Sequence, residues 1–458
     1  MVRLSYRYEL RSALTFPLAA ALAEGTFTGI VASKYFHASP VLIAVITAAP
    51  MFGNILALVW AELGKTRRKV PFINWLQLGV ITCIAGVALT GWLPLGVGGW
   101  VFAALIILAR VLASGIITLR SAIWRHNYPR HLRGQIVARI TVVATAVLAT
   151  TTLAGSIVLD RRADAFAWFY PSAALLGAVG IWQFSNIRVR GETSQLRRVN
   201  GRRRMSTIST PRPESLALTD ETNVINYEPR PQRGLPSLVS DAMSVLRTDR
   251  RFREYQWWQS ISGSSFMMMQ PPLVFMVSQQ MTDARTQYAL ATVVLQIIPL
   301  ITSLVFTQVW APVFDRLHIL RFRAVQSFVS LGTMSLIFVG AYFDSLLLIA
   351  VAQFCLGVAN AAGNLAWNLG QNDFAPPEKI ATYMGVHVML TGVRGCFAPF
   401  LGVLLYQQLI GRWVFAVAAG LSLLSLVGFQ KMARGVPTKH PARTLQRAGT
   451  VEPATSRH

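Results

Sequence analysis

Residues 99–119 read GWVFAALIILARVLASGIITL and contain one charged side chain, Arg110, in an otherwise apolar run. A helix rises 1.5 Å per residue, so about 20 such residues cross the roughly 30 Å hydrocarbon core of a bilayer. The run therefore predicts a membrane-spanning helix with a charge near its middle. Similar runs bring the prediction to twelve spans, at 13–33, 40–61, 71–91, 99–119, 135–158, 165–185, 257–279, 287–310, 324–342, 345–366, 380–407 and 413–430.

The overall composition agrees with a membrane protein. Of the 458 residues, 53% are hydrophobic and 14% are charged, and the mean hydropathy is +0.45. About a quarter of the residues are charged in ordinary globular domains, so a soluble enzyme, a disordered chain and a fibrous repeat are excluded. Cys83, Cys355 and Cys396 lie in apolar runs, which indicates buried thiols. The sequence has no phosphate-binding glycine loop and no metal-ligand spacing, so we expect no enzyme activity, no cofactor and no metal.

A weakly hydrophobic segment of about seventy residues divides the predicted spans into six and six. We predict an N-terminal six-helix bundle at 1–186 and a cytoplasmic basic linker at 187–256. A C-terminal six-helix bundle follows at 257–430, and a cytoplasmic tail at 431–458.

Basic residues are distributed unevenly between the two sides. With the N-terminus inside, the cytoplasmic segments contain 35 of the 43 Lys and Arg residues. The outside loops contain Lys34, Arg161, Arg162, Arg285 and Arg412. The positive-inside rule therefore places both termini and the linker in the cytoplasm, and we expect a plasma (inner) membrane location. This sorting accounts for the net charge of +24 without a nucleic-acid partner. A cleavable signal peptide is less favoured, since the first apolar run continues past 21–23 to about residue 31.

The linker contains the basic run 197–204, which we expect to contact anionic lipid. Apolar residues recur at helical spacing from Leu235 to Arg253 and predict an amphipathic helix that lies at the membrane interface. A short solvated helix is the alternative interpretation. The sequence defines no oligomeric state and is compatible with a monomer.

Two internal matches relate the halves. Arg110, Ser114 and Trp124 are spaced like Gln353, Gly357 and Trp367, at an offset of 243. The segments 58–61 and 308–311 also match, and a basic segment follows each. These matches indicate duplication of a six-helix unit, which is typical of transporter folds.

The chain resembles the major facilitator superfamily of transporters over nearly its whole length. The loop after span two keeps Gly64, Arg67 and Arg68 of the family's motif. The loop after span eight has the better copy, with Asp315-Arg316 followed by Arg321 and Arg323. The resemblance implies a fold of twelve helices in two pseudo-symmetric bundles. It also implies that Arg67, Arg68, Asp315 and Arg316 form a cytoplasmic gate of charge pairs.

The glycine- and proline-rich segment 395–402 of span eleven is similar to a family motif of antiporters, which normally marks span five. Span five here lacks the proline, so the segment does not establish antiport. Pro271 and Pro272 predict a kink that breaks span seven at a gate.

Three charges lie near the middle of predicted spans: Glu24, Arg110 and Arg394. A charge at the bilayer centre costs about 2.5–3.5 kcal/mol, so these side chains are expected to face a shared water-filled cavity. With the polar residues on the same helix faces, the candidates for substrate binding or coupling are Glu24, Arg110, Arg394, His387, Gln353, Asn360, Asn364, Gln296 and Gln270.

Each candidate has a structural alternative. Glu24 and Arg110 can pair to hold spans one and four together, and this role is compatible with transport. Arg394 is either satisfied by carbonyls and amides or directed at an anionic substrate. His387 and the amides of span ten can be interhelical hydrogen bonders.

We therefore predict a secondary active transporter that moves a small solute by alternating access. Proton coupling at Glu24 is expected, and two mid-membrane arginines against one glutamate favour an anionic or zwitterionic solute. One alternative is a multidrug or metabolite efflux antiporter, favoured by the Met- and Phe-rich span seven. Another is a sensor or assembly factor that has the fold and transports nothing.

Overall fold

The computed structural model describes residues 2–193, 235–283, 285–376 and 379–436, and these residues are helical throughout except for short connections. The predicted basic run 197–204 and the tail from 437 onward lie outside the described residues. The first bundle contains α1 (Val2–Ala20), η1 (Ala21–Ala23), α2 (Gly25–Tyr35), α3 (Pro40–Lys65), α4 (Lys69–Val87), η2 (Ala88–Trp92), α5 (Leu95–Asn127), α6 (Arg130–Arg161), η3 (Ala163–Ala165) and α7 (Phe166–Ser185).

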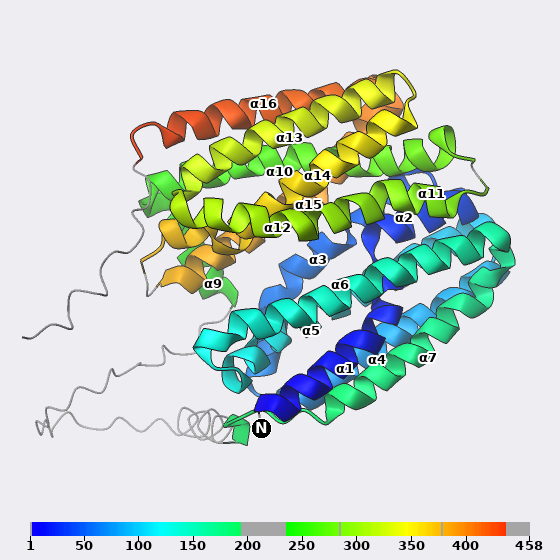
Figure 1. The fold of residues 1–458 in the computed structure, drawn as a ribbon, viewed down its shortest axis with the longest axis horizontal. Helices are drawn as coiled ribbons and strands as arrows, with labels where there is room; N and C mark the ends of the chain where they lie inside the picture. Colours follow the sequence, from blue (N-terminus) through cyan, green and yellow to red (C-terminus); the bar gives the residue numbers. More distant parts are fainter. Residues whose placement is uncertain (1, 194–234, 284, 377–378, 437–458) are drawn as a thin grey trace, which may run out of the picture.

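The second bundle begins after α9 (Leu235–Thr248). It contains α10 (Arg250–Met276), η4 (Val277–Met281), α11 (Tyr288–Thr292), η5 (Val293–Ile297), α12 (Ile298–Arg316), α13 (Ile319–Tyr342), α14 (Leu346–Leu369), η6 (Gly370–Asp373), α15 (Ile380–Leu404), η8 (Leu405–Leu409), η9 (Gly411–Trp413) and α16 (Val414–Ala433). The start of α1, the end of α16 and α9 lie toward one end of the molecule, on the left of Figure 1, which we name the termini end.

Nine described helices are long and apolar enough to cross a membrane, or ten when the bent pair of Arg3–Ala23 and Gly25–Tyr35 counts as one span. The remaining passes are α3, whose apolar part is Pro40–Leu56, and α10, which is rich in polar residues. The twelve predicted spans thus correspond to twelve helical passes, and the protein is an all-helical membrane protein.

Several helices extend beyond the predicted spans at the termini end. Helix α5 continues to Asn127 and α6 begins at Arg130, so most of the connection between the predicted spans 99–119 and 135–158 is helical. The hydropathy of the sequence marks where a helix leaves the bilayer. The helix itself can continue into water until residues that end a helix are reached. Here the stop is Pro129, which favours an extended conformation at the preceding Tyr128.

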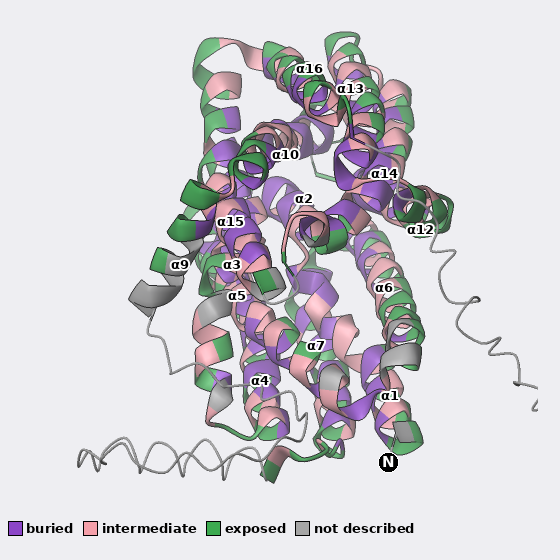
Figure 2. Ribbon diagram, turned by 90° about the vertical axis from the view of Figure 1, so that its left-hand side faces the viewer, coloured by how far each residue is buried: buried purple, intermediate pink, exposed green. Residues whose placement is uncertain are grey.

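The helix packing of the first bundle recurs in the second, as the sequence repeat predicts. Helix α5 packs on α3 and α4 as α14 packs on α12 and α13. Helix α1 packs on α6 and α7 as α10 packs on α15 and α16, and α4 packs on α7 as α13 packs on α16. Figure 2, viewed toward the termini end, shows the two bundles one above the other, with buried residues concentrated inside each.

The bundles contact each other at the end opposite the termini and also nearer the middle. At the end opposite the termini, α2 packs on α10 and α11, and α6 packs on α11 and η5. Toward the termini end α6 and α12 diverge (Figure 1). Helix α3 contacts α15 nearer the middle, where Gly392 faces Ile55 and Gly395 faces Met51. Part of the glycine-rich segment of span eleven therefore lets the bundles approach closely.

The predicted amphipathic helix is present but ends at Thr248 instead of continuing to Arg253. The Asp249 side chain accepts from the Phe252 amide at 2.9 Å and starts α10 as its N-cap. It also accepts from the Tyr383 hydroxyl at 2.8 Å. Val245 of α9 is buried, so this helix packs on the bundle with at least part of its apolar face.

The predicted break at Pro271 and Pro272 is wrong, because α10 continues through both prolines and the helix geometry changes only in η4. Pro272 has no N–H, so it cannot donate to the Met268 carbonyl one turn earlier. Gly402 of α15 packs directly on that carbonyl: a Cβ at position 402 would lie 1.8 Å from the Met268 oxygen. Close helix packing thus covers the carbonyl that the proline leaves free.

Candidate functional site

The first span is interrupted at Glu24, between η1 and α2, and its two parts are bent by 46°. Glu24 has extended backbone angles, φ −72° and ψ 131°. Its carboxylate accepts from Arg110 Nη1 of α5 at 2.9 Å. The two predicted mid-membrane charges of the N-terminal bundle therefore meet where the first span is discontinuous, and substrate sites of transporters are often formed by discontinuous helices.

The Glu24–Arg110 pair is partly accessible, with 35% of the Glu24 side chain and 21% of the Arg110 side chain exposed. Arg110 Nε is buried and has no hydrogen-bond partner among the described residues. The guanidinium therefore has an unused donor beside the Glu24 carboxylate. Such a donor can bind an anionic group.

Arg394 does not join this pair. It extends from α15 past α10, where Arg394 Nη1 donates to the Gln259 carbonyl at 2.7 Å. Gly263 of α10 provides the passage, because a Cβ there would lie 2.4 Å from Arg394 Cζ. The structure thus separates the three mid-membrane charges between the bundles, instead of grouping them around the single chamber that we expected.

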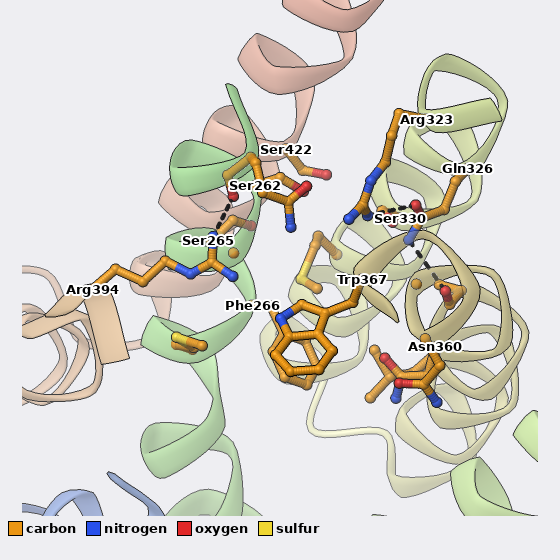
Figure 3. A pocket seen from close by; sticks show the side chains of 18 residues that line it. Ser262, Ser265, Phe266, Arg323, Gln326, Ser330, Asn360, Trp367, Arg394 and Ser422 are labelled. Atoms are coloured by element: carbon orange, nitrogen blue, oxygen red, sulfur yellow. Dashed lines mark hydrogen bonds between the residues drawn. The ribbon is translucent and has the colours of Figure 1, made fainter. Parts of the chain in front are cut away.

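The Arg394 guanidinium enters a cavity of about 170 Å³ inside the C-terminal bundle. The cavity is lined by α10, α13, α14, α15 and α16, and the predicted Asn360 and Asn364 lie on its α14 wall (Figure 3). Trp367, the repeat partner of Trp124, lines it as well. Asn360, Asn364 and Trp367 of span ten therefore line a cavity within the C-terminal bundle, whereas Gln353 does not.

Arg323 lines the same cavity. Its position in the sequence predicted a basic cytoplasmic loop, and that prediction is wrong for this residue. It lies in α13, is 4% exposed, and Arg323 Nη1 donates to Gln326 Oε1 at 2.7 Å. Its Nε and Nη2 are buried without a partner among the described residues. The sequence does not separate Arg323 from its neighbours Arg316 and Arg321. Arg323 is buried because it lies on the inward face of the first turns of α13.

The other predicted candidates lie outside the cavity lining. His387 is fully buried, and its Nδ1 lies 3.2 Å from Gln256 Oε1. Gln296 Nε2 donates to Thr152 Oγ1 at 3.3 Å and joins the two bundles. Gln353 is buried, with its Oε1 unpartnered among the described residues, and Gln270 is half-buried in α10.

The charged residues of the predicted cytoplasmic gate lie at or just after the ends of α3 and α12. Arg67, Arg68, Asp315 and Arg316 are exposed, and none of them forms an ion pair within the described residues. Arg67 instead lies over the Phe72 ring, with its Cζ 4.9 Å from the ring centroid. Gly64 is buried against Leu119 of α5, so this motif glycine allows close helix packing.

The opposite end is sealed by Lys34, which the sequence analysis placed in an outside loop. Lys34 is 2% exposed and donates across the bundle interface. Its Nζ contacts the Ser278 carbonyl at 2.9 Å, Thr282 Oγ1 at 2.9 Å and the Thr286 carbonyl at 2.8 Å, and also the Asp283 carbonyl. The sequence feature that could have indicated this seal is a single lysine at the end of an apolar run.

Further contacts reinforce this seal. Asp160 of α6 accepts from the amides of Tyr288 and Ala289 at the start of α11. Gln279 Nε2 donates to the Ser33 carbonyl. The Asp283 carboxylate accepts the amides of Arg285 and Thr286, which lowers its pKa. The N-terminal bundle thus supplies two charged side chains, Lys34 and Asp160, that bind backbone groups of the C-terminal bundle.

A second network, also missed from the sequence, fixes the termini end of the first bundle. Glu9 is 1% exposed and accepts from Arg120 Nε at 2.7 Å, Trp124 Nε1 at 2.5 Å and the Tyr128 hydroxyl at 2.5 Å. Burial and the Glu9 carboxylate raise the pKa of Tyr128. This network joins α1 to α5 on the termini side of the Glu24–Arg110 pair.

The fold and these mid-membrane polar groups define a multi-pass membrane transporter. The family model described as "Major Facilitator Superfamily" matches residues 14–399, with a second match at 285–456. The chain belongs to the major facilitator superfamily, and it is a secondary transporter of small molecules, not an enzyme. No curated protein matches its sequence.

Solved structures share the fold at low sequence identity. A mutant of the nucleoside transporter NupG has a TM-score of 0.67 and 13% identity, covering 94% of this chain and 99% of that chain. A D-xylose–proton symporter has a TM-score of 0.64 and 11% identity, covering 94% and 98%. The inward-open xylose transporter XylE from E. coli has a TM-score of 0.61 and 12% identity, covering 96% and 97%. At these identities the likeness shows the fold alone.

Proposed function

We propose that this protein is a proton-coupled carrier of a small anionic or zwitterionic solute. The observation that supports this proposal is the Glu24–Arg110 ion pair at the interruption of span one. An ionised Glu24 occupies Arg110. A proton on Glu24 removes that negative charge and frees the guanidinium for a carboxylate or phosphate of the solute.

Charge balance supports this coupling. When a proton neutralises Glu24 and a monoanion pairs with Arg110, the net charge of the site is unchanged. Uncompensated charge in the membrane is costly, so proton and anion would bind together more readily than either alone. The carrier would then switch between its outward- and inward-facing states while the charges in the site are balanced.

Alternating access is supported by the asymmetry of the contacts between the bundles. The seal around Lys34 closes the end opposite the termini, and the charges of the predicted gate are apart at the termini end. Transport would require the Lys34 contacts to separate while Asp315 and its basic neighbours come together. The positive-inside distribution supports a cytoplasmic termini end in a plasma (inner) membrane, with the basic linker on anionic lipid.

The test uses full-length protein in liposomes that enclose a pH-sensitive dye. Carboxylates, amino acids, nucleosides and sugars are added outside one at a time, and the lumenal pH is recorded. We expect a carboxylate or amino acid to carry protons inward, and Glu24→Gln to abolish this movement. Glu254→Gln is the matched control, since Glu254 is an exposed carboxylate on α10. Unchanged proton movement in Glu24→Gln would refute the coupling role.

A second candidate is a multidrug or metabolite efflux antiporter. It is favoured by Phe266, Met267 and Met334, which line the cavity of the C-terminal bundle. Drug accumulation in cells, measured with and without an uncoupler, separates the candidates: an antiporter lowers accumulation only while the proton gradient is intact.

A further inference from the structure

We propose that the cavity inside the C-terminal bundle is a binding site for a compact anionic group, a carboxylate or phosphate, held between Arg323 and Arg394. This inference goes beyond the proposed function. The cavity belongs to one bundle and is separate from Glu24 and Arg110, and anion binding there does not require transport.

The first argument is the charge of the cavity lining. Its eighteen described residues include two arginines and no aspartate or glutamate. Arginine stays protonated in proteins, so both guanidinium groups are cationic. Two like charges that face one cavity within a membrane protein need a counter-charge, and the lining does not supply one.

The second argument is the unused hydrogen-bonding capacity of both arginines. Arg323 uses Nη1 for Gln326, while its Nε and Nη2 are buried and unpartnered within the described residues. Arg394 uses Nη1 for the Gln259 carbonyl, and its Nε is likewise unpartnered. A guanidinium presents its donors in a planar fork that matches a carboxylate or phosphate. The free donors therefore match the oxygens of such a group.

The third argument is geometric. Figure 3 shows the guanidinium groups of Arg323 and Arg394 approaching from different walls, with the ring of Trp367 below them. Gly263 gives Arg394 clearance past α10, since any Cβ there would collide with the guanidinium. The arrangement thus directs a charged side chain into the bundle interior.

The size of the cavity limits the ligand. Its volume of about 170 Å³ corresponds to roughly six water molecules at about 30 Å³ each. A phosphate or a carboxylate with a short carbon chain fits this space. Ser262 and Asn360 line it with neutral polar groups, which can bind the remaining oxygens of the anion.

The test is isothermal titration of the purified full-length protein in detergent with sodium phosphate and with sodium succinate, at constant ionic strength. We expect saturable binding of at least one anion, weakened roughly tenfold or more by Arg323→Gln or Arg394→Gln. Arg251→Gln is the matched control, because Arg251 is an exposed arginine outside the cavity. The proposal is overturned if neither anion shows saturable binding. It is also overturned if all variants bind the anion equally.

A second variant keeps the test valid if a glutamine substitution prevents folding. Gly263→Ala retains both positive charges but displaces the Arg394 guanidinium, so it should weaken anion binding as well. Gly420→Ala is its control, since no atom outside its own helix lies within 4 Å of a Cβ at that position. Undiminished binding by a folded Gly263→Ala contradicts the proposed geometry.

Liposome uptake of radiolabelled phosphate and succinate then distinguishes the sources of the anion. An anion that is bound and accumulated is cargo, whereas one that is bound but not accumulated is a resident ligand of the bundle. Binding lost in Arg323→Gln while Glu24→Gln binds normally supports the separate site. A protein that transports nothing but still binds the anion refutes only the proposed function.

Discussion

Lys34 Nζ lies 2.9 Å from the main-chain oxygen of Ser278, and this contact joins two helices that are 244 residues apart in the chain. Three further oxygens of the same segment surround the ammonium group. The closed state of this end thus depends on a lysine that binds carbonyls and a hydroxyl, and these acceptors lose their donor when the bundles separate.

We expect Lys34→Met to lower the free energy of unfolding by about 2–4 kcal/mol, because several buried acceptors lose a charged donor. Thermal unfolding in detergent measures this change. A cysteine introduced by Ser278→Cys, at a fully buried position, should also become more reactive toward a polar maleimide in the Lys34→Met background. Arg285→Met is the control, since Arg285 is exposed in the same loop. Equal effects of the two substitutions would contradict a seal at Lys34.

Arg110→Gln should destabilise the protein by about 2 kcal/mol, because it leaves Glu24 without its partner in the membrane. The double variant Glu24→Gln, Arg110→Gln should be less destabilised than the sum of the single variants, since no unpaired charge remains. A double-mutant cycle on thermal unfolding measures this coupling. Strict additivity would show that the two side chains do not interact.

Gly402→Ala should destabilise the protein by about 1–3 kcal/mol and reduce transport, because the added methyl group would overlap the Met268 carbonyl and push α15 from α10. Gly420→Ala provides the comparison, as it adds the same methyl group with nothing within 4 Å. Thermal unfolding of both variants decides the matter: a Gly402→Ala protein as stable as Gly420→Ala would rule out the close contact.

Glu9→Gln should cost about 3 kcal/mol of stability, since Arg120 then has no counter-charge in a largely buried network. Tyr128→Phe should cost only about 1 kcal/mol, because it removes one hydrogen bond and leaves the ion pair intact. Thermal unfolding of both variants tests this ranking, and Glu9→Gln should have the lower unfolding temperature. The opposite order would contradict a stabilising ion pair between Glu9 and Arg120.

The sequence predicted much of the candidate chemistry but not its grouping. Glu24, Arg110 and Arg394 were identifiable because charged residues are conspicuous in apolar runs. Arg323 and Lys34 were not, because each lies at the edge of an apolar run, where a basic residue is ordinary. Whether such a side chain points into the bundle or toward water depends on the packing of the helix that carries it.

The sequence by itself determined the number of membrane passes, the division into two similar halves, the asymmetry of basic residues and the mid-span charges. These features follow from local hydropathy and from helical period, which are properties of short segments. The tertiary structure alone decided that Glu24 meets Arg110, that Arg394 passes Gly263 into its own bundle, and that Lys34 seals one end. Such contacts depend on how helices distant in sequence approach and cross, and no single segment contains that information.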